Sequence, residues 1–341
     1  YRIREKAAPE GYTVSVTDMQ SVTVTAGTVS AVTFANDTIT GKIRIVKTDQ
    51  LTKQPLFGVE FTITRLSTPA GRNGIGEVVA VITTDENGAA ETGWLDWGRY
   101  RVEETKVPEH FVDTNFSTEI DAYENGKTYM VEVENEPAKG WIRITKTDAL
   151  DGTPIAGVVF DIYSNDEYGS ELAGSMTTGE DGVALSEPLR KGSYIVREHD
   201  NPVGYVSELA QVDAVVLSDE ITDISASNTP IQGKIRIIKK DQLTGEALSG
   251  AEFTITRVSG LPSHNGSNDG EVVAIITTDA NGLAESPLLT WGTYRVEETV
   301  VPQHFVDNAF STEVVIDTEN QTCEIVAENE PTKGWLRLTK T

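Results

Sequence analysis

Internal repetition constrains this sequence more than any other feature. The stretch GKIRIVKTDQLTKQPLFGVEFTITRL at 41–66 returns as GKIRIIKKDQLTGEALSGAEFTITRV at 233–258. A more distant copy, KGWIRITKTDALDGTPIAGVVFDIYS, lies between them at 139–164. Self-similarity at a fixed spacing is typical of tandem structural units. The sequence therefore predicts several copies of one domain in a row, of two alternating kinds.

The repeat also sets the expected domain limits. We expect three full domains, at 41–136, 140–229 and 233–330. Residues 1–37 match the C-terminal half of the second kind of domain, and residues 333–341 match its first strand. We therefore expect a segment of a longer repetitive protein. The alternative is that the end segments of neighbouring chains complete each other.

Short strands are the expected secondary structure of each unit. Runs rich in Val, Ile, Thr and Tyr are separated by turn signals such as TDENG at 84–88 and GEDG at 179–182. No segment sustains the period of 3.6 residues that an amphipathic helix requires. Several short strands in about 95 residues predict an all-β fold of tandem β-sandwiches.

The linkers between the units are short, which favours an elongated, semi-rigid rod. EPAK at 136–139 and TPIQ at 229–232 leave little slack between neighbouring domains. Tryptophans lie close to these linkers or before the glycine that opens a strand, and we expect them to pack near domain junctions. They are Trp97, Trp141, Trp291 and Trp335.

Composition excludes several classes of function. The net charge of −25 argues against nucleic acid or an anionic membrane as a partner, since both attract an excess of Lys and Arg. Cys323 is the single cysteine, so no disulfide forms within the chain. No apolar run is long enough to cross a membrane, and the first residues lack the apolar region of a signal peptide. The acidic turns lack the ligand pattern of a calcium loop, so we expect no metal and no cofactor.

Three polar side chains fall on inward-facing strand positions in every unit. In the first strand Ile43, Ile45 and Lys47 share one face, because side chains alternate across a strand. The same parity places a glutamate on the apolar face of the strand that begins G-x-Y, and an asparagine on that of the last strand. The sets are Lys47, Glu104 and Asn135; Lys146, Glu198 and Asn228; and Lys239, Glu298 and Asn329.

Buried charges are costly, so these groups must meet or be neutralised. One interpretation is a buried Lys–Glu ion pair with the asparagine as a hydrogen-bond partner, although such pairs often fail to recover their desolvation cost. The other interpretation is chemical. A desolvated lysine loses its proton and becomes a nucleophile, and the glutamate shuttles protons. Attack on the asparagine side chain then expels ammonia and leaves an amide cross-link.

The combined frame K-x-D, G-x-x-F, L-x-x-G-x-Y-x-[VI]-x-E-x-x-x-P and a terminal Asn resembles the Cna B-type, SpaA-like repeat domains of Gram-positive surface proteins and pilins. In the first unit it consists of Lys47, Asp49, Gly58, Phe61, Gly98, Tyr100, Glu104, Pro108 and Asn135. The resemblance implies an immunoglobulin-like, prealbumin-like sandwich with a spontaneous Lys–Asn isopeptide bond between first and last strands, promoted by the glutamate. PEHF and PQHF replace the usual P-x-G-Y, so His110 and His304 are expected in a rebuilt turn.

The two partial units carry incomplete sets. Glu5 and Asn36 have no upstream lysine, and Lys340 has no downstream glutamate or asparagine. The resemblance assigns these residues the same roles as in the full units.

These observations favour a structural stalk or fibre shaft of a bacterial protein, located outside the cell and either cell-wall anchored or in a surface fibre. Its expected partners are neighbouring repeats or copies of itself. One alternative is a pilus-like, self-assembling filament subunit. Another is an adhesin segment that binds a host matrix protein or glycan through the loops at 66–77 and 258–271. We expect no enzyme, since the Lys–Glu–Asn set is consumed in one event.

Overall fold

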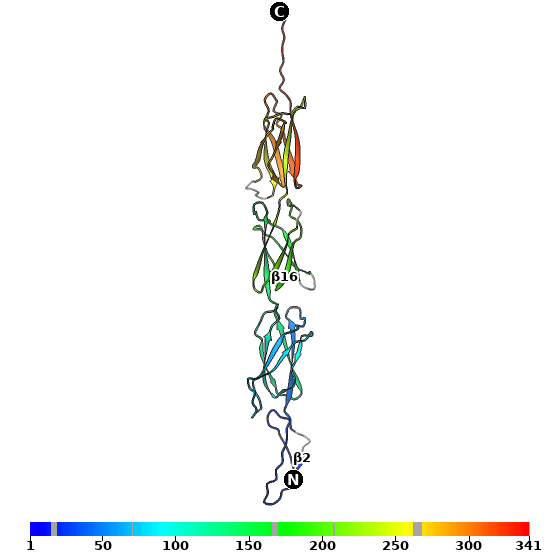
Figure 1. Ribbon diagram of the computed structural model, residues 1–341, viewed down its shortest axis with the longest axis vertical. Coiled ribbons are helices and arrows are strands. Elements are labelled where there is room, and N and C mark those ends of the chain that lie inside the picture. The colour runs from blue at the N-terminus through cyan, green and yellow to red at the C-terminus, as the bar shows by residue number, and fades with distance from the viewer. Residues whose placement is uncertain (15–18, 70, 166–169, 207–208, 262–267, 341) are drawn as a thin grey trace. The chain divides into compact units, whose positions relative to one another are not determined.

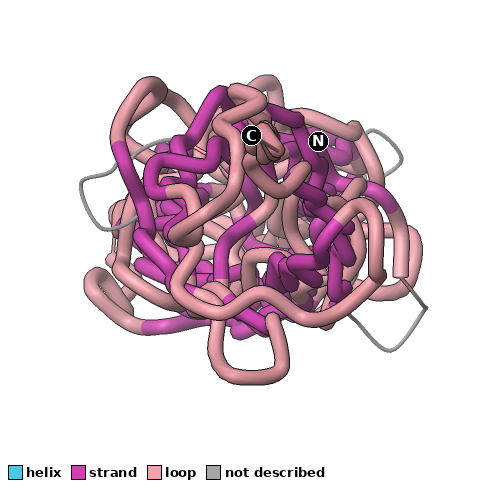
Figure 2. Tube along the Cα trace, turned by 90° about the horizontal axis from the view of Figure 1, so that it is seen from above, coloured by secondary structure: helices cyan, strands magenta, loops and turns pink. Residues whose placement is uncertain are grey.

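The computed structural model describes residues 1–14, 19–69, 71–165, 170–206, 209–261 and 268–340, in two compact units, Tyr1–Lys139 and Gly140–Thr341. Figures 1 and 2 show strands joined by loops, and the described residues contain no helix. The prediction of an all-β chain of tandem sandwiches is confirmed.

The first unit contains a short hairpin and one full sandwich. In the hairpin, β1 (Arg2–Arg4) pairs with β2 (Met19–Ser21) in antiparallel fashion. One sheet of the sandwich is built around β3 (Thr40–Asp49), which pairs with β10 (Lys127–Asn135), β6 (Ala89–Glu91) and β7 (Leu95–Asp96). The other sheet has the order β5 (Val78–Thr83), β4 (Glu60–Arg65), β8 (Gly98–Lys106) and β9 (Ser117–Ala122).

The second unit contains two sandwiches, and the middle domain of the chain comes first. Its first sheet is built around β11 (Lys139–Asp148), which pairs with β18 (Ile221–Asn228), β14 (Val183–Leu185) and β15 (Leu189–Arg190). Its second sheet has the order β13 (Leu172–Thr177), β12 (Val159–Ser164), β16 (Gly192–Glu198) and β17 (Gln211–Val216).

The third domain repeats the strand order of the first. Its first sheet is built around β19 (Gln232–Asp241), which pairs with β26 (Gln321–Asn329), β22 (Leu283–Glu285) and β23 (Leu289–Thr290). Its second sheet has the order β21 (Val272–Thr277), β20 (Glu252–Gly260), β24 (Gly292–Val300) and β25 (Ser311–Ile316). Residues 332–340 form no strand here, and the assignment of residues 333–341 as the opening strand of another domain stays a prediction.

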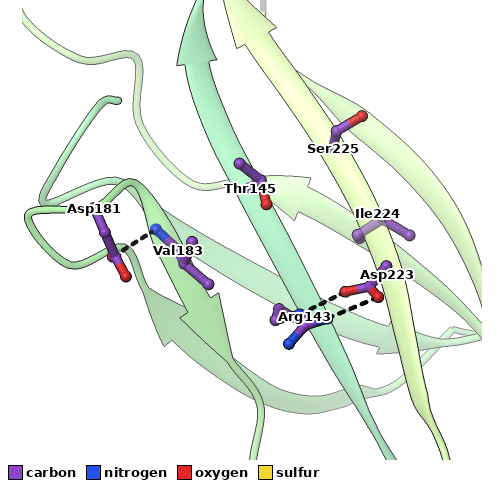
Figure 3. A pocket seen from close by; sticks show the side chains of 7 residues that line it. All are labelled: Arg143, Thr145, Asp181, Val183, Asp223, Ile224 and Ser225. Carbon is purple, nitrogen blue, oxygen red and sulfur yellow. Dashed lines mark hydrogen bonds and ion pairs between the residues drawn. The ribbon is translucent and has the colours of Figure 1, made fainter. Parts of the chain in front are cut away.

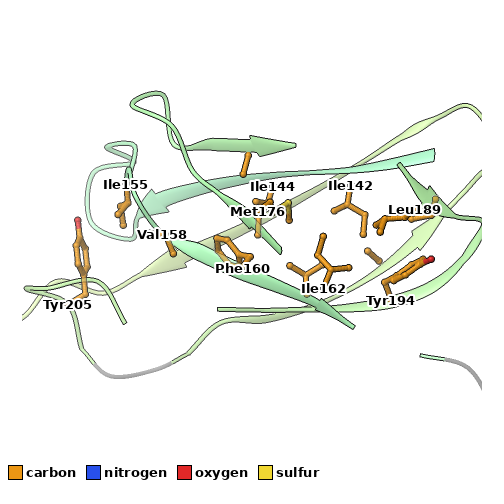
Figure 4. Close-up of a cluster of buried hydrophobic side chains, with 14 of the residues drawn as sticks. Ile142, Ile144, Ile155, Val158, Phe160, Ile162, Met176, Leu189, Tyr194 and Tyr205 are labelled. Atoms are coloured by element: carbon orange, nitrogen blue, oxygen red, sulfur yellow. The ribbon is translucent and has the colours of Figure 1, made fainter. Parts of the chain in front are cut away.

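Each sandwich encloses its own core of side chains from the inward faces of both sheets. In the middle domain Ile142 and Ile144 meet Phe160 and Ile162 across the interior (Figure 4). Full burial of such side chains stabilises the fold by about 1.5–3 kcal/mol each. The alternating burial of β3 and β11 shows how a period of two residues in the sequence becomes a one-sided core.

Two glycine-bearing turns pack against a tryptophan of the next domain within the same unit. A Cβ atom on Gly11 would lie 3.4 Å from the Trp97 ring, and one on Gly204 would lie 3.1 Å from the Trp291 ring. Both glycines have positive φ, of 85° and 90°. These contacts agree with the expectation for Trp97 and Trp291, whereas Trp335 is almost fully exposed.

Candidate functional site

The lysine of each full domain lies late in the first strand, where a turn glycine holds its backbone. Lys47 donates its amide hydrogen to Gly88 O at 2.8 Å, and a Cβ atom on Gly88 would collide with the carbonyl oxygen of Lys47. Gly182 and Gly282 make the same contacts with Lys146 and Lys239. The recurring acidic turn thus has a structural purpose, because its glycine permits this close approach.

Parallel pairing of the first and last strands brings the asparagine beside the lysine. In the first domain Lys47 is opposite Val133 and Asn135 is opposite Asp49. The two side chains are therefore diagonal neighbours on one face of the sheet, a separation that a long side chain can span. The same register recurs between β11 and β18 and between β19 and β26.

The glutamate comes from the facing sheet. Glu104 on β8 is the cross-strand partner of Phe61 on β4, and its carboxylate points into the core. Lys47 Nζ lies 5.9 Å from the centre of the Phe61 ring. Phe160 and Phe253 occupy this position in the other two domains. The phenylalanine of the G-x-x-F motif therefore forms one apolar wall of the site.

In the first domain the three predicted residues form a closed triangle of contacts. Lys47 Nζ lies 2.9 Å from Glu104 Oε2, and Asn135 Nδ2 donates to Glu104 Oε1 at 2.7 Å. Lys47 Nζ also contacts Asn135 Oδ1 directly. The side chains of Lys47 and Glu104 are 0% and 1% exposed. The amine thus faces the carboxamide carbonyl with the carboxyl group bridging both.

The middle domain forms the same triangle. Lys146 Nζ lies 3.1 Å from Glu198 Oε2 and contacts Asn228 Oδ1, while Asn228 Nδ2 donates to Glu198 Oε1 at 3.0 Å.

The third domain gathers the same residues with one contact fewer. Lys239 Nζ lies 3.0 Å from Glu298 Oε1, and Asn329 Nδ2 donates to Glu298 Oε2 at 3.1 Å. The carbonyl oxygen Asn329 Oδ1 is buried without a hydrogen-bond partner among the described residues. Glu298 therefore joins the amine and the carboxamide of this site.

In the first partial unit the structure brings the glutamate and the asparagine together. Asn36 Nδ2 donates to Glu5 Oε1 at 2.9 Å, which is the Glu–Asn half of the triangle. Glu5 Oε2 and Asn36 Oδ1 are buried and unpartnered in the described structure. Lys340 is exposed. These three residues keep their predicted roles only as expectations.

Burial shifts the three lysines toward their neutral, nucleophilic form. Desolvation lowers the pKa of Lys47, Lys146 and Lys239, and the hydrogen bond and charge of the paired glutamate offset part of that effect. Removing the charged amine from water is costly, so the equilibrium moves toward the free amine. An unprotonated lysine beside a carboxamide and a proton carrier is chemically equipped for acyl transfer.

Sequence patterns missed a second aromatic residue over two of the sites. Phe116 packs edge-on against Phe61 with ring centres 6.4 Å apart, and Phe310 packs against Phe253 at 6.1 Å. Both phenylalanines follow the glutamate of their domain at the same spacing in the sequence, and this equal spacing could have revealed them. In the middle domain Ala210 replaces this ring.

The remaining singled-out residues lie away from the chemistry. His110 and His304 occupy exposed turns, and each accepts a backbone hydrogen bond from the linker that follows its domain. Cys323 is half-buried against the third core. No group of potential metal ligands and no helix able to span a bilayer occurs in the described ranges.

The surface of the middle domain has a shallow, mainly polar groove. Arg143 Nε lies 2.5 Å from Asp223 Oδ1 across β11 and β18. The rest of the lining consists of Thr145, Asp181, Val183, Ile224 and Ser225 (Figure 3). Arg143 points outward, as its parity predicts. Of the loops considered for ligand binding, residues 70 and 262–267 lie outside the described residues.

Comparison with known proteins decides the family. The profile described as "SpaA: Prealbumin-like fold domain" matches residues 41–137, 140–230 and 233–331. The chain belongs to the SpaA family of prealbumin-like fold domains. The SpaA-like resemblance in the sequence is thereby confirmed. A search of curated proteins returned no match.

Several solved structures are similar to this chain. The Bacillus anthracis TIE protein is 26% identical with a TM-score of 0.71, over 86% of this chain and 51% of that chain. The chain thus spans about half the length of that protein. BcpA, the major pilin subunit of Bacillus cereus, is 17% identical with a TM-score of 0.42, over 86% of this chain and 100% of its own. The major pilin SpaD of Corynebacterium diphtheriae is 16% identical with a TM-score of 0.31, over 86% and 98%.

Proposed function

We propose that this chain is part of a structural stalk or fibre shaft on a bacterial surface, in which an autocatalytic Lys–Asn isopeptide bond locks each full domain. The observation that carries the proposal is the buried Lys–Glu–Asn cluster found in each of the three full domains. Its lysine and asparagine lie on the parallel first and last strands, and its glutamate lies on the facing sheet. Membership of the SpaA family supports a pilin-like or surface-protein role.

The proposed reaction is an intramolecular acyl transfer. The lysine Nζ forms a bond to the asparagine Cγ, and the Cγ–Nδ2 bond breaks. One proton passes from the amine through the glutamate carboxyl group to Nδ2, and ammonia leaves. The product is a neutral amide, so the desolvation cost of the buried amine disappears. Each site reacts once, and the chain is a substrate of its own chemistry rather than an enzyme with turnover.

Strand direction gives the bond a mechanical role. Force applied along the chain enters the first domain at the start of β3 and leaves at Asn135, the last residue of β10. A bond between Lys47 and Asn135 carries that force from one strand directly to the other. The 88-residue span between the two residues then bears no load. The sandwich cannot unravel unless a covalent bond breaks.

Single-molecule pulling of the full chain tests this function. We expect the three full domains of the wild-type chain to stay folded, so that the chain shows no lengthening from unfolding before the attachment points fail. Asn135→Ala should restore one unfolding event, with a length that corresponds to the first domain. The other two domains serve as internal controls in the same molecule. Three unfolding events in the wild-type chain would refute the mechanical role.

A further inference from the structure

The middle domain provides two side-chain acceptors for the carboxamide nitrogen of its asparagine. Asn228 Nδ2 donates one hydrogen bond to Glu198 Oε1 at 3.0 Å and another to Asn201 Oδ1 at 3.2 Å. Both hydrogens of the carboxamide nitrogen therefore have acceptors. This arrangement fixes the amide orientation, with Oδ1 toward Lys146 and Nδ2 away from it.

Asn201 is itself anchored by the turn that follows it. Its Nδ2 donates to the carbonyl oxygen of Tyr205 at 2.8 Å, so its Oδ1 remains aimed at Asn228. Glu198 is also fixed, because its Oε2 accepts a hydrogen bond from the backbone N–H of Ala210 at 3.0 Å. The second acceptor and the carboxylate are thus both held in place before any reaction.

The corresponding positions in the other domains lack this side chain. Val107 and Val301 precede the proline where the middle domain has Asn201. In the third domain the backbone carbonyl of Val306 accepts from Asn329 Nδ2 at 3.1 Å and provides a second acceptor in another way. Among the described residues of the first domain, Glu104 is the only acceptor for Asn135 Nδ2.

We propose that Asn201 is the leaving-group acceptor of the middle domain, a side chain that binds the ammonia expelled from Asn228. This inference rests on the proposed cross-link. When Lys146 Nζ bonds to Asn228 Cγ, Nδ2 gains a proton and develops positive charge before the Cγ–Nδ2 bond breaks. An oxygen atom already directed at that nitrogen stabilises this positively charged transition state more than it stabilises the neutral amide. Asn201 thus lowers the barrier to ammonia departure.

The test follows cross-linking of the full chain during cell-free synthesis. Samples are quenched in acid at intervals, and peptide mapping measures ammonia loss separately in each domain. Asn201→Val introduces the residue that the sister domains carry. We expect it to slow the middle domain about tenfold, as loss of a charge-assisted hydrogen bond should. The rates of the first and third domains should stay unchanged.

Asn201→Asp separates the proposed role from a purely structural one. Aspartate keeps an acceptor oxygen but loses the donor that anchors the turn to Tyr205. We expect it to restore the rate to within a few-fold of wild type. A rate for Asn201→Val equal to wild type, or a rate for Asn201→Asp as slow as that of Asn201→Val, would overturn the assignment alone. A wild-type middle domain that loses no ammonia would overturn the proposed cross-link, and this assignment with it.

Discussion

A lysine buried in an apolar interior is stable only if its charge is compensated or removed. Lys47 meets Glu104 and Asn135 in a site closed to water, and the same set recurs in both other full domains. Ion pairing alone leaves two desolvated charges, whereas amide formation leaves none. At the scale of the residue, the proposed cross-link therefore accounts for the buried amine in each domain.

The glutamate should be indispensable to the reaction. Replacing Glu104 by Gln keeps the shape of the side chain but removes the group that carries protons between the amine and the carboxamide. We expect the first domain to retain its ammonia, while the other two domains cross-link normally. Domain-resolved mass spectrometry measures this. Glu103→Gln is the matched control on the same strand, and loss of cross-linking in that variant would contradict the assigned role.

The lysine pKa predicts how cross-linking depends on pH. Burial lowers the pKa of Lys47 below its ordinary value of 10.5. The fraction of free amine in the folded site therefore rises with pH up to that lowered pKa. The cross-linking rate should increase over that window and then level off. Between that lowered pKa and the ordinary 10.5 the unfolded state binds more protons than the folded state, so the stability of the unreacted Asn135→Ala variant should rise with pH there. Denaturation at several pH values would detect this, and a fall in stability would contradict it.

At the scale of the element, strand parity was predictable from the residues, whereas strand direction and register were not. The period of two residues identified the buried faces of β3, β8 and β10, because burial follows alternation directly. Parity does not specify which strands pair, in which direction or in which register. The parallel pairing that places Asn135 diagonally to Lys47 emerged only from the structure. Asn201 was missed because it follows a strand, where alternation no longer applies.

The turn glycine beside the lysine should be sensitive to substitution. Gly88 has a φ of 69°, and a side chain there would strike the Lys47 carbonyl oxygen. We expect Gly88→Ala to destabilise the first domain by about 1–3 kcal/mol more than a comparable glycine replacement. Gly126→Ala is the matched control, because Gly126 has a φ of 74° but open space around it. Urea denaturation in an Asn135→Ala background measures both, and equal losses would refute the close-approach argument.

At the scale of the whole molecule, the same buried set of lysine, glutamate and asparagine recurs in both kinds of domain. The proposed bonds close loops of 88 residues in the first domain and 82 in the middle one. Loop-closure entropy grows only slowly with length, so each bond should contribute a similar stabilisation. The repeated frame made the number of domains predictable from the sequence, since each unit brings its own complete set.

Removing the bond should therefore cost each domain about the same free energy. By analogy with a disulfide of this loop length, Asn135→Ala and Asn228→Ala should each lower the free energy of unfolding by about 4–5 kcal/mol. Reducing agents should leave wild-type stability unchanged, unlike that of a disulfide-bonded protein. Calorimetry of single-domain variants within the full chain gives the comparison. A loss well below 1 kcal/mol would show that no loop is closed.

Peptide mapping of the purified wild-type chain by tandem mass spectrometry tests the central claim most directly. We expect three branched peptides, each lighter than the sum of its two linear parts by one ammonia. Their fragmentation should join Lys47 to Asn135, Lys146 to Asn228 and Lys239 to Asn329. Recovery of the six linear peptides at full mass from folded protein would contradict the account.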